Sequence, residues 1–237
     1  DDAGAWGLRG AVKGELHTFG MSPFTGPGDG TYYDDGILYL FEGGVDIPLL
    51  RREKLQLRGD HNVQNVLAAL AAGMALGLPA DAVQRGIATL SGVPGRMEKV
   101  AVGQDFTVLV DYAHTDDALK NLLETVRGLG PRRVITVFGC GGDRDRTKRP
   151  LMGAVAARLS DVVVITSDNP RGEDPVRIID EIKRGVPSGR DAASLLTVVD
   201  RREAIQLAIR TAQPGDLILL AGKGHEKSQV IGDRELP

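Results

Sequence analysis

The segment Val162-Val163-Val164-Ile165 decides the fold class, because four consecutive apolar residues leave no polar face for solvent. A strand of this kind is buried on both faces, which is typical of a parallel sheet covered by helices. Similar segments alternate with helical patterns along the second half of the chain. We predict strands at 107–110, 133–138, 162–166, 195–199 and 217–220, and helices near 116–129, 148–159, 175–184 and 201–212. The sequence therefore predicts an α/β domain with a mostly parallel sheet.

The first part of the chain has a different pattern. Short β-prone runs at 31–33, 37–41 and 45–49 are separated by the hairpin signals Asp34-Asp35-Gly36 and Gly43-Gly44, and the composition of 23–30 indicates a loop. Two helices follow, one at 60–77 that Asp60 can cap and one at 79–90. The breaker run Gly92-Val93-Pro94-Gly95 then marks the best domain boundary.

The composition excludes several classes of protein. The chain has 237 residues, 42% of them hydrophobic, so it can bury a core as one large domain or two smaller ones. The net charge of −3, with both signs mixed, argues against nucleic-acid binding. Cys140 is the single cysteine, which excludes a disulfide scaffold and a cysteine-rich zinc site and fits a reducing cytosol. The longest apolar stretch, 66–78, is too short to span a bilayer, and no signal peptide is recognised. A start at Asp1 is compatible with a piece of a longer protein.

Polar residues follow the ends of the predicted strands, where parallel sheets bind ligands. After the strand at 107–110, Asp111 is either a helix cap or an acceptor for a ribose hydroxyl, and the residue types leave both open. Taken alone, His114 favours a capping or surface role over a catalytic base. The glycines after 133–138 precede a cationic run and allow close approach to an anion, but the Gly-Lys-Ser/Thr ending of a P-loop is missing.

Two further loops follow the later strands. In the first, Asp174-Pro175 has the pattern of a helix cap and first turn, which leaves Arg171 unexplained. In the second, Gly222-Lys223-Gly224 is compatible with a plain turn that carries a solvated lysine, with Glu226 as a surface charge. Together the loops indicate a site for an anionic or zwitterionic ligand, but no reaction.

Seven motifs occur in order along the chain. They are GDHNVQN from Gly59, GRME from Gly95, DYAHT from Asp111, FGCGGDRD from Phe138, KRPLMG from Lys148, DNPRGEDP from Asp168 and AGKGHE from Ala221. In this order they resemble the Mur ligase family, ATP-dependent enzymes that join amino acids to the growing cell-wall peptide. Each motif alone is weak, whereas the set is highly specific and covers most of the chain.

The resemblance implies a domain organisation and a cellular setting. Residues 1–96 are expected to be the C-terminal part of a central ATP-binding domain, and residues 97–237 a Rossmann-like C-terminal domain that binds the amino acid. The family's uridine-binding domain, P-loop, carbamylated lysine and magnesium ligands are expected in N-terminal and central segments of a parent protein, and a short C-terminal end is expected to be missing as well. ATP and Mg²⁺ are the expected cofactors, no residue of this chain is assigned to the metal, and a cytoplasmic enzyme with no nucleic-acid or membrane partner is expected.

The resemblance also implies a reaction and an acceptor. ATP phosphorylates the glutamate carboxylate of a UDP-linked muramoyl dipeptide, and the amine of the acceptor then attacks the acyl phosphate. In the family, the Arg of a DNPR motif marks enzymes that add meso-diaminopimelate, and Arg171 occupies that position. A planar guanidinium suits the extra carboxylate of this acceptor, which lysine lacks. The implied acceptor-binding residues are Arg144, Asp168, Asn169, Pro170, Arg171, Gly222 and Glu226.

For the nucleotide, the motifs imply contacts from Asn65 to adenine and from Arg96 and Asp111 to ribose, with His61 near the phosphates. Asn62 and Asn65 lie three apart, which puts both on one face of a helix. No protein general base is convincing, and the candidates are His114 and His225.

Three alternatives remain at this stage. A lysine-adding Mur ligase keeps the family but changes the acceptor. A folylpolyglutamate synthase-like ligase shares the ATPase plan, but the DNPRGEDP loop argues against it. The third alternative is a non-catalytic module that binds nucleotide or amino acid. The missing P-loop would favour it if the natural protein began at Asp1. In either case the chain by itself is expected to be inactive.

Overall fold

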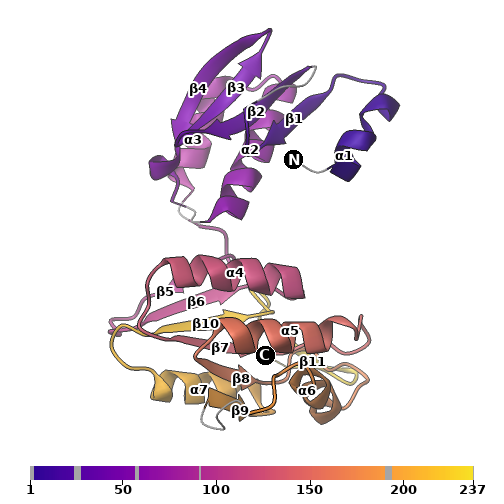
Figure 1. Ribbon diagram of the computed structural model, residues 1–237, viewed down its shortest axis with the longest axis vertical. Coiled ribbons are helices and arrows are strands. Elements are labelled where there is room, and N and C mark those ends of the chain that lie inside the picture. The colour runs from indigo at the N-terminus through magenta and orange to yellow at the C-terminus, as the bar shows by residue number, and fades with distance from the viewer. Residues whose placement is uncertain (1–2, 24–27, 57–58, 91, 190–193, 237) are drawn as a thin grey trace. The chain divides into compact units, whose positions relative to one another are not determined.

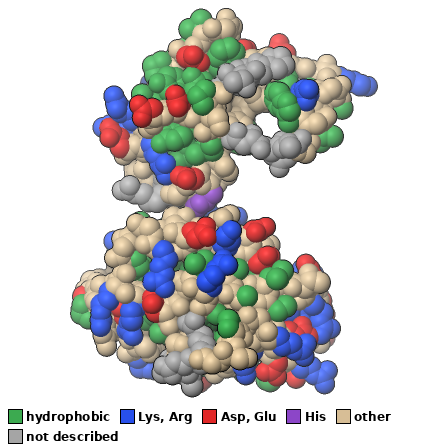
Figure 2. Space-filling model, viewed as in Figure 1, with side chains coloured by type: hydrophobic (Ala, Val, Ile, Leu, Met, Phe, Trp, Pro, Cys, Tyr) green, Lys and Arg blue, Asp and Glu red, His purple; other side chains and the backbone are tan. Residues whose placement is uncertain are grey.

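The computed structural model describes residues 3–23, 28–56, 59–90, 92–189 and 194–236. The chain divides into two compact units, Asp1–Gly92 and Val93–Pro237, and each is described by itself (Figure 1). Within these ranges no helix is long and apolar enough to cross a membrane. Lys and Arg side chains are spread among Asp and Glu over the visible face of the second unit (Figure 2).

The first unit is a small sheet with helices. Strands β1 (His17–Gly20) and β2 (Asp29–Asp34) pair in parallel, whereas β3 (Ile37–Glu42) and β4 (Val45–Arg51) continue the sheet in antiparallel fashion. The helices are α1 (Ala3–Gly7), α2 (Asp60–Ala75) and α3 (Ala80–Thr89), with short 3-10 turns at Arg9–Ala11 and Arg52–Lys54. Apolar residues of α2 such as Val63, Leu67 and Leu70 pack against Leu38 of β3 and Leu55.

Most of the predicted elements of this unit are confirmed, with three differences. The strand β1 was not predicted, and part of the expected loop at 23–30 is strand, since β2 begins at Asp29; residues 24–27 of that loop lie outside the described residues. The proposed cap was wrong, because Gly59 is the cap residue of α2 and no side chain caps the helix. Instead, the carboxylate of Asp60 pairs with Arg52 at 2.5 Å.

The second unit is a six-stranded sheet in the order β5-β6-β10-β7-β8-β9. Its strands are β5 (Glu98–Val100), β6 (Thr107–Asp111), β7 (Val134–Phe138), β8 (Val162–Ile165), β9 (Leu195–Thr197) and β10 (Leu217–Ala221). All neighbours pair in parallel except β5 with β6. The helices are α4 (Asp116–Gly128), α5 (Lys148–Leu159), α6 (Pro175–Lys183) and α7 (Arg201–Thr211). The predicted alternation of strands and helices, and the mostly parallel sheet, are confirmed.

Alternate residues of the central strands face two separate cores. Phe138 of β7 and Ile165 of β8 pack with α4, α5 and α6, whereas Ile135 and Val164 pack with α7 on the other face. Burial on both faces is the physical reason why these strands have no polar periodicity. As predicted, Asp174 caps α6, and its side chain accepts a hydrogen bond from the N–H of Val176.

Three short strands were not predicted. β5 is an exposed edge strand of three residues, and β11 (Gln229–Ile231) and β12 (Arg234–Leu236) form a small antiparallel hairpin after the last parallel strand. Strands this short carry too few alternating residues to be recognised from sequence. The hairpin nevertheless positions the predicted acceptor loop, because the backbone of Arg171 forms a bridge with Ile231.

A buried ion network ties the glycine-rich loop after β7 to the loop after β8. Arg149 is fully buried on α5, and its guanidinium bonds both carboxylate oxygens of Glu173 at 2.8 and 2.9 Å. It also donates to Glu181 at 2.7 Å and to the carbonyl of Gly141 at 3.1 Å. Hydrogen bonds from Arg149 and from the N–H of Asp143 lower the pKa of Glu173 from 4.5 to about 2. The network therefore holds both loops in one position.

We expect Arg149→Leu to lower the free energy of unfolding of the chain by about 3 kcal/mol or more, because it leaves two carboxylates without their buried countercharge. Urea unfolding monitored by circular dichroism measures this change. The matched control is Arg146→Leu, since Arg146 also pairs with Glu181 but its side chain is 63% exposed. The control should cost less than about 1 kcal/mol. Equal losses of unfolding free energy in the two variants would show that the buried pairs of Arg149 stabilise the chain no more than the exposed pair of Arg146.

The same network predicts a pH dependence of stability. A carboxyl group whose pKa is depressed in the folded state adds stability above its ordinary pKa, and this stability is lost as the pH falls toward the folded value. For Glu173 that window runs from 4.5 down to about 2. We expect the free energy of unfolding of the wild-type chain to fall more steeply across this window than that of Arg149→Leu. Parallel pH profiles for the two proteins would contradict the assignment.

Candidate functional site

The candidate site lies at the carboxyl edge of the parallel sheet. Strands β6, β10, β7 and β8 are consecutive neighbours, so the loops after them lie next to one another. These loops contain the predicted DYAHT, AGKGHE, FGCGGDRD and DNPRGEDP motifs. Ligands of open parallel sheets bind at this edge.

Glycines in these loops permit close packing of one loop on another. A Cβ at Gly142 would overlap the carbonyl oxygen of Pro170, which is itself buried. Gly222 has a φ of +108°, and a Cβ there would lie 3.0 Å from Oδ2 of Asp168. Loop packing therefore explains why glycine is needed at both positions. The close approach to an anion that the sequence suggested for the glycines after β7 is not required to explain Gly142.

Arg171 is held by its backbone and by one edge of its guanidinium. Its φ of +50° is in the left-handed region, which a non-glycine residue adopts only where neighbours enforce it. Here its N–H donates to Val230 and its carbonyl accepts from Gly232. Nη1 donates to the carbonyl of Gly142 at 2.9 Å and, more weakly, to that of Asn169 at 3.4 Å. Nε and Nη2 donate to no residue within the described ranges, so one edge of the planar cation is open.

Asn169, Lys223 and Glu226 form a hydrogen-bonded cluster beside Arg171. The ammonium of Lys223 donates to Oδ1 of Asn169 and to Oε2 of Glu226, both at 2.8 Å. The amide nitrogen of Asn169 donates to the same Oε2 at 2.9 Å. The second oxygen of Glu226, Oε1, receives no hydrogen bond from the described residues. Oε1 is thus a free acceptor. Asp168 is similar: its Oδ1 accepts a hydrogen bond from the N–H of Asn169, and its Oδ2 accepts none from the described residues.

The cluster corrects one sequence interpretation. The Gly-Lys-Gly run was compatible with a solvated lysine, but Lys223 is only 9% exposed and paired with Glu226. Glu226 is an exposed residue, as the sequence interpretation expected. Composition could not reveal the burial of Lys223, because the inward direction of the lysine depends on the loops around it. The fully buried Arg149 was missed for the same reason, since an arginine in a cationic run gives no sign of burial.

The structure brings six of the seven predicted acceptor residues into this contact region. They are Asp168, Asn169, Pro170, Arg171, Gly222 and Glu226. Arg144 is exposed, and its guanidinium donates to the carbonyl of Asp143 but to no other described residue. Its long side chain is therefore free to reach a ligand.

The predicted ribose residues lie close together at the end of β6. Asp111 is buried, and its two carboxylate oxygens accept hydrogen bonds from the N–H groups of Ala113 and Met97, each at 2.8 Å. It does not cap the next helix, because Thr115 performs that role. Arg96 is exposed and stacks over the ring of Tyr112 at 5.1 Å.

The two candidate bases, His114 and His225, flank the same tyrosine ring. Their rings lie 4.7 and 5.6 Å from the ring of Tyr112, and both residues are exposed. Nδ1 of His114 contacts the carbonyl of Tyr112 at 2.9 Å. In the described structure neither histidine pairs with a carboxylate, the partner that orients and polarises many catalytic histidines.

The other two nucleotide residues belong to the first unit. His61 is half-buried and Asn65 is exposed, both in the first turns of α2. The amide of Asn65 lies 3.4 Å from Oδ1 of the buried Asn62, which confirms that the two asparagines share a face. Neither asparagine caps the helix.

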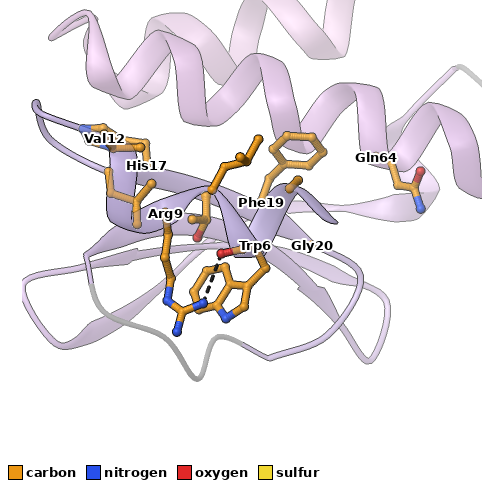
Figure 3. A pocket seen from close by; sticks show the side chains of 11 residues that line it. Trp6, Arg9, Val12, His17, Phe19, Gly20 and Gln64 are labelled. Atoms are coloured by element: carbon orange, nitrogen blue, oxygen red, sulfur yellow. Dashed lines mark hydrogen bonds between the residues drawn. The ribbon is translucent and has the colours of Figure 1, made fainter. Parts of the chain in front are cut away.

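The first unit also contains a cavity of about 450 Å³ between its N-terminal segment and β1. Figure 3 shows Trp6 and Arg9 at its edge, where the guanidinium stacks on the indole at 5.0 Å, together with Phe19 and Gln64. Its lining is largely apolar and includes none of the predicted site residues.

A cavity of the second unit adjoins the predicted acceptor loops. It measures about 360 Å³ and is lined by residues of α7 and of the 223–229 segment, among them Arg201, Lys223 and Glu226. Nη2 of Arg201 donates to the carbonyl of Ala221, whereas Nη1 is buried without a partner among the described residues.

Comparison with known proteins agrees with this geometry. Two curated relatives are both named UDP-N-acetylmuramoyl-L-alanyl-D-glutamate–2,6-diaminopimelate ligase. The protein from Solibacter usitatus is 56% identical over 180 residues, which is 76% of this chain and 36% of the relative. The protein from Thermosynechococcus vestitus is 52% identical over 199 residues, which is 83% of this chain and 38% of the relative. The chain therefore spans well under half the length of these relatives.

Solved structures give the same result. A structure of a ligase with the same name is 35% identical, has a TM-score of 0.58, and is matched over 92% of this chain and 44% of its own. A folylpolyglutamate synthase from Mycobacterium tuberculosis is 24% identical with a TM-score of 0.59, covering 81% of this chain and 44% of its own, and shows only that the fold is shared. Residues 95–224 match the family described as "Mur ligase, glutamate ligase domain". Because this match covers more than half of the chain, the chain belongs to the Mur ligase family.

Proposed function

We propose that this chain is the part of an ATP-dependent ligase that binds meso-diaminopimelate and joins it to UDP-N-acetylmuramoyl-L-alanyl-D-glutamate. The observation that carries the proposal is the open edge of Arg171 beside two free carboxylate oxygens, those of Glu226 and Asp168. A site with one open cation and two open anionic acceptors suits a zwitterionic amino acid. The names of the relatives described above support the same acceptor.

Arg171 is the proposed selectivity residue. Meso-diaminopimelate differs from lysine by a second carboxylate at its far end, and two parallel N–H donors of a guanidinium match a carboxylate. Arg171 has Nε and Nη2 available for this pairing, while Nη1 is held by the carbonyl of Gly142. With lysine bound, the guanidinium would lose solvent without gaining a partner, which costs on the order of 1–3 kcal/mol.

Glu226 and Asp168 are proposed to hold the ammonium of the same end of the acceptor. Burial alone would raise the pKa of Glu226, but hydrogen bonds from Lys223 and Asn169 outweigh burial, so the pKa lies below its ordinary value. The carboxylate is then ionised at neutral pH and can accept from an ammonium through Oε1. Gly222 permits the close approach of Asp168 to this loop.

For the nucleotide, we propose that Arg96 and Asp111 bind ribose and that Asn65 and His61 contact adenine and the phosphates. The geometry at the end of β6 fits this role, because Arg96 is exposed and Asp111 is fixed by two backbone N–H groups. ATP, when bound, supplies the phosphoryl group that activates the glutamate carboxylate. No group of three or more His, Cys, Asp or Glu is gathered in the described part of the chain, so we assign no Mg²⁺ ligand and derive no step through the metal.

The proposed contribution of this chain to the chemistry is alignment. Holding the far end of the acceptor by Arg171 and Glu226 restrains its reacting amine relative to the activated carboxylate, and such alignment accounts for much of the rate of amide ligation. The amine must lose a proton before it attacks. His114 and His225 remain the proposed candidates for that step.

The acceptor is tested by amino-acid-dependent phosphate release from a full-length protein that carries this chain. It is supplied with ATP, Mg²⁺ and the UDP-linked dipeptide. We expect release with meso-diaminopimelate and at least about ten-fold less with L-lysine, because lysine leaves the Arg171 guanidinium unpaired. The 237-residue chain alone, which contains no P-loop, should give none. Preference for lysine would retain the family but reject the role of Arg171, and glutamate-dependent release with a folate substrate would favour the other ligase class.

The role of Arg171 is tested by Arg171→Ala in the same protein. We expect the KM for meso-diaminopimelate to rise by about 100-fold, because a bidentate charge-assisted pair is lost, while the KM for ATP changes less than about two-fold. The matched control is Arg177→Ala, since the Arg177 side chain is 85% exposed on α6. Equal increases in both KM values would show that Arg171 supports the fold of the site rather than binding the acceptor.

A further inference from the structure

Lys223 lies at the centre of the acceptor cluster without being one of the proposed ligands. We infer that Lys223 is a positioning residue: its ammonium fixes the Asn169 amide and the Glu226 carboxylate so that Oε1 of Glu226 stays open toward the ammonium at the far end of the acceptor. This inference rests on the proposed function. It concerns a residue that the sequence made compatible only with a solvated lysine in a plain turn.

The hydrogen bonds around Asn169 define a single orientation of its amide. Oδ1 accepts from two donors, the ammonium of Lys223 at 2.8 Å and the N–H of Val230 at 2.9 Å. Nδ2 is thereby turned toward Oε2 of Glu226. A flipped amide would oppose its oxygen to the carboxylate and its NH₂ to two donors, which is unfavourable at both ends. Removing Lys223 would take away one of the two donors that enforce this choice.

The same ammonium determines which oxygen of Glu226 is free. Oε2 accepts from both Lys223 and Asn169, so its lone pairs are used within the cluster. Oε1 has no hydrogen bond from the described residues and is the oxygen left for a ligand. An ammonium on the acceptor therefore meets an ionised and already oriented oxygen, which lowers the entropic cost of binding.

Lys223 is turned inward by the glycines beside it. The N–H groups of Gly222 and Gly224 both donate to the carbonyl of Asp111, at 3.0 and 3.2 Å. Gly224 has a φ of +50°, and a Cβ there would lie 2.7 Å from Cβ of Tyr112. The turn is thus held against the end of β6, and the lysine between the two glycines has a side chain only 11% exposed.

The charges that act on Glu226 come from three elements. Lys223 belongs to its own loop, Arg171 to the loop after β8, and Arg201 to α7. Lys223 is the member that bonds the carboxylate directly. Without it, the burial that opposes ionisation of Glu226 would be offset only by Asn169 and by the two more distant guanidinium groups.

The first test measures the ionisation of Glu226 itself and needs no substrate. Glutamate side-chain carboxyls of the 237-residue chain are labelled with carbon-13 and titrated by NMR, with Glu226→Gln used to assign the signal. We expect the pKa of Glu226 to lie below its ordinary value in the wild-type chain and to rise in Lys223→Met, because the ammonium that bonds the carboxylate is lost. The matched control is Lys227→Met, an exposed lysine of the same loop, which should leave the titration unchanged. A Glu226 titration that is the same in Lys223→Met and wild type would overturn the inference.

The second test uses a full-length protein that carries this chain. Lys223→Met should raise the KM for meso-diaminopimelate at least about ten-fold with the KM for ATP unchanged, and Lys223→Arg, which keeps the charge, should restore part of the loss. Loss of kcat alone, or no rescue by arginine, would contradict a positioning role.

The outcomes separate this inference from the function on which it rests. If no acceptor supports phosphate release, the proposed function fails, while the NMR titration still decides whether Lys223 controls Glu226. If Lys223→Met does not fold, Lys223→Gln, which also removes the charge, provides the titration. If both variants unfold while Lys227→Met folds, Lys223 is a structural residue and the inference is rejected.

Discussion

The buried ion network of Arg149 is the interaction on which the proposed acceptor site depends. A fully buried guanidinium joins Glu173, in the loop after β8, to the carbonyl of Gly141, in the loop after β7. Apart from the bridge between Arg171 and the β11–β12 hairpin, these loops lack regular structure, so the charge pairing adds rigidity that a helix or strand would otherwise give. Arg171 then donates to the carbonyl of Gly142, and its open edge is defined relative to that fixed loop. Precise recognition of an amino acid requires such preorganised groups, because a loosely held cation would lose binding energy to ordering.

A second set of contacts supplies the opposite charge. Lys223, Asn169 and Glu226 share three hydrogen bonds, and the turn that carries Lys223 is held by the carbonyl of Asp111. Asp111 is also the proposed ribose residue, and its carboxylate fixes the N–H of Met97. The acceptor loop and the proposed nucleotide loop are therefore supported by the same residue at the end of β6. This physical connection is consistent with a ligase, in which amino acid and nucleotide must be aligned within one catalytic cycle.

The motif residues divide into those that face a ligand and those that hold the loops. Arg171, Glu226 and Asp168 keep donors or acceptors unused by the described residues, as expected of binding groups. Arg149 and Lys223 are instead largely or wholly enclosed by their partners. Both kinds occur within the same short motifs, and a family resemblance gives no means of separating them. Burial and hydrogen-bond partners make that distinction.

The sequence by itself determined the α/β class, the five parallel strands, the helices between them and the position of the polar loops after the strands, because apolar runs and helical periodicity are local properties of the chain. Arg171 could be singled out because a cap and turn left it unexplained. Tertiary structure alone decided that Gly59 rather than Asp60 caps α2, that the β11–β12 hairpin supports Arg171, and that Lys223 is buried. The direction of a long charged side chain depends on partners distant in the sequence. For Lys223 those partners include Asn169, which lies 54 residues earlier in the chain, and no local pattern records that pairing.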